Sequence, residues 1–285
     1  MRILTLLALF AISACDSGEI GGTQSSDAAL SDGTPSTDSQ TSGAGDGGID
    51  ADANIANGTN PSNGSGGDFP GAKVRSAPLT GGGTINYNLY IPGSYSPGTA
   101  IPIVTLFHGQ GGSAENIVSF WTSVAEAEGF MLLATTATGS SGGWVPGSDI
   151  GRYSDALDDA LAAYNVEQDR IYIWGFSAGA HIVHGVALTN TDTFAAYSVS
   201  AGVLDAFAGG NAPATAARRI PVDIHIGTAD SLFAGAMSDR GRFTTAGWVE
   251  GADFSWSPFD GGHTLLPSHP SEIWDFIKAY RLPPG

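Results

Sequence analysis

The chain has 285 residues, a formal net charge of −17 and one cysteine, Cys15. It carries 11 basic residues against 28 acidic ones, and its few Lys and Arg are not gathered into the basic cluster that binds a phosphate backbone, so we expect no nucleic-acid partner. A single cysteine also excludes intramolecular disulfides, so a folded domain must depend on its hydrophobic core.

The N-terminal segment has the pattern of a secretion signal. Residues 1–15 (MRILTLLALFAISAC) contain one Arg and then an apolar run that is too short to span a bilayer. The ending Ile12-Ser13-Ala14-Cys15 resembles the bacterial lipobox, in which the cysteine becomes lipidated. We therefore predict a signal peptide over residues 1–15 and an extracytoplasmic lipoprotein anchored to a membrane through Cys15. The alternative is an ordinary secretory signal and a secreted protein.

Residues 16–71 consist mainly of Ser, Gly, Thr, Asn, Ala and Asp, with nine acidic residues and no Lys or Arg. Such a segment buries too little apolar surface to offset its chain entropy. We predict a disordered, flexible tether over residues 16–71. Residues 72–285 then form one domain, of a size common for a single α/β domain.

Strand and helix patterns alternate through residues 72–285. In chain order, strands are expected at residues 84–91, 101–107, 130–135, 170–174, 194–199, 222–226 and 253–256. Helices are expected at residues 113–128, 152–164, 178–188, 238–250 and 271–280, and Ser113 or Asn116 caps the first of them. Repeated β–α–β units indicate an α/β fold with a mainly parallel sheet covered by helices on both faces. Ligands bind beyond the carboxyl ends of such strands, so the loops that follow them are the candidate sites.

The junction between the strand at 170–174 and the helix at 178–188 reads Gly175-Phe176-Ser177-Ala178-Gly179. G-x-S-x-G in this context is the nucleophile-elbow pattern. The glycines prevent collisions in a sharp, strained turn, and the helix N-terminus favours developing negative charge. We predict that Ser177 is a nucleophile. The alternative is a Gly-rich turn with a serine N-cap and no chemistry.

A nucleophilic serine requires a base, and the base requires an orienting acid. Asp230 ends the turn after the strand at 222–226, and His263 lies in a Gly-rich loop after the last strand. The order Ser, Asp, His is that of α/β-hydrolases. We predict Asp230 as the acid and His263 as the base. The rival candidates are Asp223, His225, Asp260 and His269. Asp223 and His225 rank lower because they lie inside a buried strand.

The loop His108-Gly109-Gln110-Gly111-Gly112 directly follows the buried strand at 101–107. Acyl transfer requires N–H donors aimed at the oxyanion of the tetrahedral intermediate. We predict that the amides of Gln110 and Ala178 are these donors. The candidate substrate contacts are His108, Gly109 and Trp144.

Neither a metal nor another cofactor is expected. His181 and His184 are three residues apart on the helix at 178–188. Catalytic zinc usually has a third protein ligand, and no cysteine is available in the domain to supply it. Core or surface histidines are the simpler interpretation.

Four segments resemble the polyhydroxybutyrate depolymerase and feruloyl/acetyl-xylan esterase family of α/β-hydrolases. They are residues 169–179 (DRIYIWGFSAG), 108–109 (HG), 227–230 (GTAD) and 262–263 (GH). The resemblance covers most of residues 80–282. It implies the α/β-hydrolase fold and a secreted serine esterase with Ser177, Asp230 and His263 as its triad. The sequence itself shows no insertion long enough for a full lid domain, so we expect little or no lid. The chain departs from the family pattern at Gln110 and at residues 264–267, which shape the pocket.

The leading hypothesis is therefore a carboxylic-ester hydrolase. Its expected partner is an ester substrate: feruloyl- or acetyl-decorated polysaccharide, short-chain polyester or small acyl esters. A serine peptidase on the same fold is one alternative, although such enzymes usually carry a large extra domain. A non-catalytic surface module that binds carbohydrate is another, and the complete Ser/Asp/His set argues against it.

Overall fold

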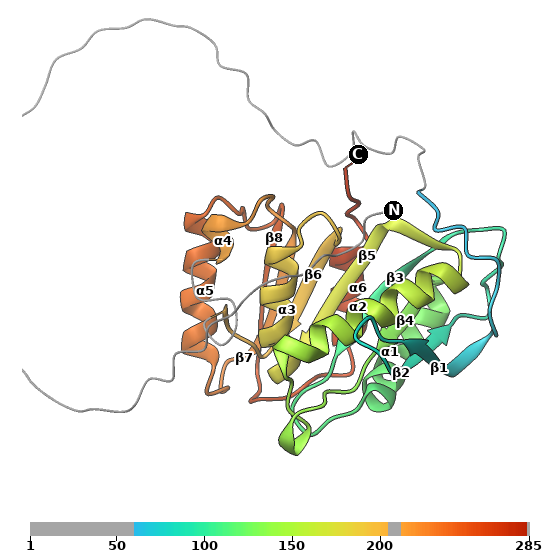
Figure 1. Cartoon of the computed structure of the whole chain (residues 1–285). Coiled ribbons are helices and arrows are strands. Elements are labelled where there is room, and N and C mark those ends of the chain that lie inside the picture. The colour runs from blue at the N-terminus through green and yellow to red at the C-terminus, as the bar shows by residue number, and fades with distance from the viewer. Residues whose placement is uncertain (1–59, 205–211, 284–285) are drawn as a thin grey trace, which may run out of the picture. The chain divides into compact units, whose positions relative to one another are not determined.

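The computed structural model describes residues 60–204 and 212–283. The predicted signal peptide, Cys15 and most of the predicted tether lie outside the described residues. In the described part, helices cover both faces of one sheet (Figure 1). Among its helices, none combines the length and apolar character that a bilayer-spanning helix requires.

The sheet contains eight strands in the order β1-β2-β4-β3-β5-β6-β7-β8. The pairs β1–β2 and β2–β4 are antiparallel, and the other neighbouring strands are parallel. The strands are β1 (Gly71–Pro78), β2 (Thr84–Ile91), β3 (Ile101–Phe107), β4 (Met131–Ala134), β5 (Val166–Phe176), β6 (Ala196–Ser200), β7 (Val222–Gly227) and β8 (Phe254–Phe259). The nearly continuous burial of β3, β4, β6 and β7 is typical of parallel strands covered on both faces.

The helices pack against the sheet through two apolar clusters. They are α1 (Ala114–Glu128), α2 (Pro146–Ala163), α3 (Ala178–Thr189), α4 (Ala212–Thr215), α5 (Phe233–Thr245) and α6 (His269–Ile277), with a 3₁₀ turn η1 (Ser140–Gly142). One cluster includes Leu157 of α2 and Val183 of α3, whereas the other includes Trp121 of α1 and Ile273 of α6. Figure 1 shows helices in front of and behind the sheet. The predicted α/β class is confirmed.

Alternation along β5 assigns its side chains to these two clusters. Ile171 and Ile173 belong to the cluster of α2 and α3, and Tyr172 and Trp174 belong to the cluster of α1 and α6. Successive residues of a strand point to opposite faces of its sheet. The strand that leads into the elbow is therefore buried on both faces and gives Ser177 a rigid support.

Several predicted elements have the expected bounds, and others differ for identifiable reasons. β2 and β3 coincide with the prediction, and Ser113 caps α1 by accepting the Asn116 amide at 3.2 Å. α2 begins six residues earlier than predicted, because Pro146 suits the first turn of a helix. α5 ends at Thr245 and not at residue 250, because Gly247 adopts a φ of 97° just beyond the helix.

The sequence prediction missed β1, α4 and the short 3₁₀ turn η1. β1 pairs antiparallel with β2 at the edge of the sheet, and most of its residues remain at least partly exposed. An edge strand of this kind lacks the apolar alternation that marks a half-buried strand. α4 has only four residues, too few for a helical period.

Residues 60–70 lie against the domain and not in a tether. Gln168 donates its amide to Asn60 O at 2.8 Å. Ser62 Oγ donates to Tyr164 O at 2.7 Å and accepts the amide of Val166 at 2.9 Å. The prediction of a disordered tether is therefore wrong for residues 60–71, the last of which begins β1. Backbone and hydroxyl hydrogen bonds hold this segment, and composition does not reveal such bonds.

Trp274 offers a test of how much the packing of α6 contributes to stability. It is 3% exposed, stacks on Phe130 with ring centroids 3.9 Å apart, and donates Nε1–H to Glu128 at 2.8 Å. We expect Trp274→Ala to lower the free energy of unfolding by about 3–5 kcal/mol, because it leaves a large cavity. Urea denaturation measures this change. Val249→Ala, at a side chain that is 56% exposed, should change it by less than about 0.5 kcal/mol. Equal effects would contradict the packing role.

Candidate active site

Ser177 lies at the sharp turn between β5 and α3. Its backbone has φ 53° and ψ −119°, a strained conformation for a residue with a side chain. A Cβ atom on Gly175 would lie 2.5 Å from the Gly179 carbonyl, and one on Gly179 would lie 2.2 Å from Phe107 O. Backbone atoms therefore fill the space beside both glycines, which is the reason the sequence analysis gave for their presence.

The structure brings Ser177, His263 and Asp230 together. His263 Nε2 lies 2.8 Å from Ser177 Oγ, and His263 Nδ1 lies 2.8 Å from Asp230 Oδ2. Ser177 comes from the β5–α3 junction, Asp230 from the loop after β7, and His263 from the loop after β8. A nucleophile, a base and an orienting acid within hydrogen-bond distance can carry out nucleophilic catalysis.

Backbone contacts between two loops support the acid and the base. The amide of Ala229 donates to Gly261 O at 2.8 Å, and the amide of Thr228 donates to Phe259 O at 2.9 Å. A Cβ atom on Gly227 would lie 2.3 Å from Gly262 O, so a glycine is needed for this approach. These contacts set the distance between Asp230 and His263.

Asp230 and His263 differ sharply in exposure. The Asp230 side chain is 0% exposed, and its Oδ1 accepts the amide of Leu232 at 2.9 Å. The His263 side chain is 39% exposed, with the ring of Phe176 beside it at 5.4 Å between centroids. The acid is therefore held inside the protein, and the base faces solvent next to the serine.

The rival residues lie elsewhere. Asp223 and His225 pair with each other at 2.9 Å, and His225 and His269 lie with ring centroids 4.7 Å apart. Asp260 is exposed in the loop before His263. None of these residues forms a hydrogen bond with Ser177 in the described part of the chain.

His181 and His184 have separate partners. His181 Nδ1 accepts the amide of Val203 at 3.0 Å, and His184 Nδ1 lies 3.2 Å from the hydroxyl of Tyr197. Burial lowers the pKa of His181, and it lowers that of His184 to about 3. Both rings therefore lie in the packing around α3.

The glycine loop after β3 reaches the elbow. A Cβ atom on Gly109 would lie 3.3 Å from Ser177 Cβ, so the two backbones are close neighbours. The amides of Gln110 and Ala178 donate no hydrogen bond to another described residue. Their role as oxyanion donors remains a prediction, and this placement is compatible with it.

His108 and Trp144 hold this loop from within. They are 1% and 8% exposed, which leaves them no open face for the substrate contact that we predicted. Trp144 donates Nε1–H to His108 O at 2.8 Å, and His108 Nε2 accepts the amide of Ala137 at 3.1 Å. His108 Nδ1 can then donate to Gly109 O at 2.7 Å. Burial lowers the pKa of His108, which favours this neutral form.

Asp149 is a supporting residue that the sequence analysis missed. It is 2% exposed, and its Oδ2 accepts the amides of Thr138 at 3.1 Å and Val145 at 2.8 Å. It therefore fixes the segment that carries Trp144. Its only sequence signal is an acidic residue just before a predicted helix, which is too common to be diagnostic.

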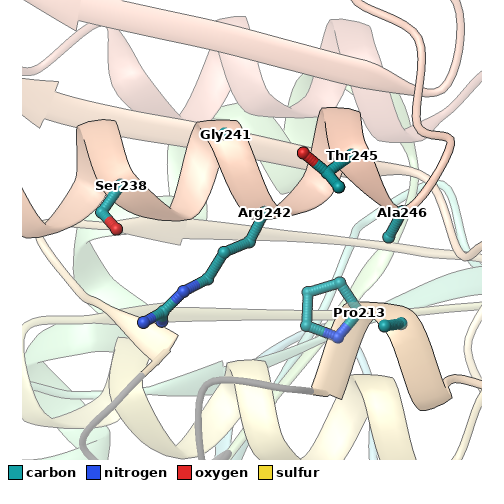
Figure 2. A pocket seen from close by; sticks show the side chains of 7 residues that line it. Pro213, Ser238, Gly241, Arg242, Thr245 and Ala246 are labelled. Atoms are coloured by element: carbon teal, nitrogen blue, oxygen red, sulfur yellow. The ribbon is translucent and has the colours of Figure 1, made fainter. Parts of the chain in front are cut away.

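Two surface pockets lie away from the triad. One, with a volume of about 380 Å³, lies between α4 and α5, where Pro213 and Arg242 flank it (Figure 2). The other lies beside Leu79 and Asp155. Neither pocket is lined by Ser177 or His263.

The chain is similar in sequence and in fold to several known proteins. No protein-family model matches the chain. A protein described as "Probable feruloyl esterase C" from Aspergillus niger is 24% identical over 226 residues, which cover 68% of this chain and 83% of the relative. A solved ferulic acid esterase has a TM-score of 0.60 at 14% identity, covering 74% of this chain and 98% of that one. The chain has the α/β-hydrolase fold.

The fold also resembles part of a larger protein. A solved chain assigned as a dipeptidyl aminopeptidase IV from Bacteroides ovatus gives a TM-score of 0.59 at 13% identity over 74% of this chain. The present chain spans only 36% of its length. At identities of 13% and 14%, the likeness to these two solved structures extends to the fold.

The close approach at Gly179 generates a prediction with a matched control. We expect Gly179→Ala to lower the free energy of unfolding by about 1–3 kcal/mol, because its methyl group would collide with the backbone of β3. Gly241→Ala lies in α5 with nothing within 4 Å of the added carbon, and should raise that free energy by up to about 1 kcal/mol. Thermal and urea denaturation measure both. Changes of the same sign would contradict this account of the elbow.

The Asp230–His263 contact generates a second prediction. We expect Asp230→Asn to lower kcat for a p-nitrophenyl ester by about 10⁴-fold, because an amide favours the wrong histidine tautomer. Far-ultraviolet circular dichroism should remain unchanged. Asp260→Asn alters the exposed aspartate nearer to His263 in sequence, and should stay within about twofold of the parent. The reverse pattern would make Asp260 the orienting acid.

Proposed function

We propose that this α/β-hydrolase is a serine carboxylic-ester hydrolase that acts outside the cytoplasm. The observation that carries the proposal is the continuous contact from Asp230 through His263 to Ser177, with both distances at 2.8 Å. Asp230 is buried, whereas His263 is 39% exposed and Ser177 is half-buried, so this contact leads from the interior toward solvent. A substrate can therefore approach the serine directly.

The proposed reaction has two halves that use the same base. His263 Nε2 removes the proton of Ser177 as Oγ attacks the ester carbonyl, and then donates it to the leaving alcohol. Asp230 holds the ring through Nδ1 and stabilises the imidazolium. Water then attacks the acyl-enzyme with His263 as the base and releases the acid. No metal or other cofactor is required.

The tetrahedral intermediate of each half carries a negative oxygen. We propose that the amides of Ala178 and Gln110 donate to it, because the first opens α3 and the second lies in the loop beside the elbow. Ala178 adds the electrostatic field of a helix N-terminus. His108 and Trp144 keep the Gln110 loop in place through the contacts described above.

The substrates that we propose are esters on large or small molecules outside the cell. They include feruloyl or acetyl groups on polysaccharide, short-chain polyester and small acyl esters. The sequence similarity to a feruloyl esterase supports the first class, and a partly exposed serine–histidine pair suits a bulky substrate. The predicted lipid at Cys15 and the tether would hold the domain at a membrane surface, and secretion without an anchor is the alternative.

Peptide hydrolysis is a second candidate function. The similarity in fold to the chain assigned as an aminopeptidase favours it, although the present chain spans only 36% of that protein. The triad suits either bond, so the choice depends on the substrate cleft. A carbohydrate-binding module without catalysis is a third candidate, and the alignment of Ser177 with its base argues against it.

A fluorophosphonate probe tests whether Ser177 is activated. We expect one adduct per folded chain, located at Ser177 by intact mass and peptide mapping. Ser177→Ala should form none and lose at least about 10³-fold of ester turnover, whereas Ser148→Ala, at an exposed serine of α2, should behave like the parent. Feruloyl, acetyl and aminopeptide substrates tested side by side then separate esterase from peptidase. A folded chain without adduct would overturn the proposal.

A further inference from the structure

A group of polar side chains, three of them buried, lies between the sheet and α6. Asp223 and His225 belong to β7, and His269 and Glu272 belong to α6. Asp223, His225 and His269 are 1%, 3% and 1% exposed. The proposed reaction uses none of these side chains. Burying so many ionisable groups is costly unless each is paired or binds a cation.

The group has the dimensions of a metal site. One ring nitrogen each from His225 and His269 and one carboxylate oxygen from Glu272 lie within 4.8 Å of one another. His225 Nδ1 and Glu272 Oε2 are 3.8 Å apart. Ligands at 2.0–2.1 Å from a tetrahedral zinc ion are separated by about 3.4 Å. Ligand atoms within 4.8 Å of one another must therefore approach by no more than about 1.4 Å. The Glu272 side chain, at 54% exposed, has room to supply part of this movement.

A carboxylate already orients the first histidine. His225 Nε2 lies 2.9 Å from Asp223 Oδ2. Asp223 in turn accepts the hydroxyls of Ser198 at 2.8 Å and Ser257 at 3.2 Å. His225 therefore directs Nε2–H to a fixed carboxylate and Nδ1 toward Glu272. Histidines that bind metals commonly donate their second ring N–H to a carboxylate in this way.

The second histidine has an unused nitrogen. Among the described residues, His269 Nε2 is buried without a hydrogen-bond partner, and Nδ1 has only a long contact of 3.4 Å with the Leu266 amide. Neutral imidazole is the form that binds metals. Binding through Nε2 would place the proton on Nδ1 and give up the long Leu266 contact.

The donor atoms of the group point to a class of metal. Two imidazoles and one carboxylate are a donor set that suits zinc and neighbouring divalent transition metals.

We propose that His225, His269 and Glu272 bind a divalent transition-metal cation of the zinc type, with water completing the coordination. The cation would join β7 to α6. His225 lies five residues before Asp230, and His269 lies six residues after His263. The site would therefore brace the elements that flank both loops of the triad. It is distinct from the His181–His184 pair considered from the sequence, and it does not rest on the serine chemistry.

Zinc uptake by the full chain tests the proposal. The protein is first stripped with EDTA and then titrated with ZnCl₂ alone by calorimetry, with elemental analysis after desalting. We expect one zinc ion per chain. At zinc a hundredfold above Kd, we expect the melting temperature to rise by about 5–10 °C, because the cation binds only the folded chain.

Substitutions on α6 locate the bound ion. Glu272→Gln changes an exposed side chain, and we expect it to weaken zinc binding by about tenfold or more without unfolding the chain. His269→Gln should do the same. Glu115→Gln is the matched control, since Glu115 is an exposed acid in the first turn of α1, as Glu272 is in α6. It should leave zinc affinity unchanged.

The triad is itself a possible zinc ligand, so a further variant separates the two sites. His263→Ala should retain the zinc uptake and the rise in melting temperature. Uptake that disappears in His263→Ala but survives Glu272→Gln and His269→Gln would overturn the proposal. So would the absence of saturable uptake by a parent chain that circular dichroism shows to be folded.

Discussion

The candidate site depends on how closely α3 packs against the end of β3. A side chain at Gly179 would meet the carbonyl oxygens of Phe107 and His108 at 2.2 and 2.7 Å, so only glycine permits the approach. The same contact holds Ser177 at a φ of 53° and brings the loop with Gln110 beside it. The position of the nucleophile and that of its proposed oxyanion donors therefore follow from one backbone contact.

The acid and the base depend on a second close approach, between the loops after β7 and β8. Hydrogen bonds from Thr228 and Ala229 to the opposite loop, with Gly227 at the closest point, place Asp230 within 2.8 Å of His263. Backbone contacts hold both approaches. Substitutions at Gly179 and Gly227 would therefore act on catalysis by displacing the triad residues, since neither glycine takes part in the reaction.

β7 has different environments on its two sides and at its end. Ile224 and Ile226 lie in apolar clusters, whereas Asp223 and His225 face α6 with a polar network. The end of the strand leads to Asp230. Asp223, His225 and Asp230 are close together in sequence, but they lie in different surroundings for this reason. The same strand connects the polar network beside α6 to the loop that carries Asp230.

The sequence by itself determined the α/β class, most of the strands and helices, and the elbow serine, because these depend on local periodicity and on glycine spacing. It also narrowed the acid and the base to a few candidates, Asp230 and His263 among them. Only the tertiary structure brought Asp230, His263 and Ser177 together and buried His108 and Trp144 behind the loop. It also placed residues 60–70 against the domain, and it brought His225 of β7 next to His269 and Glu272 of α6. These outcomes join segments that are distant in the chain, and no local pattern specifies which loops or faces will meet.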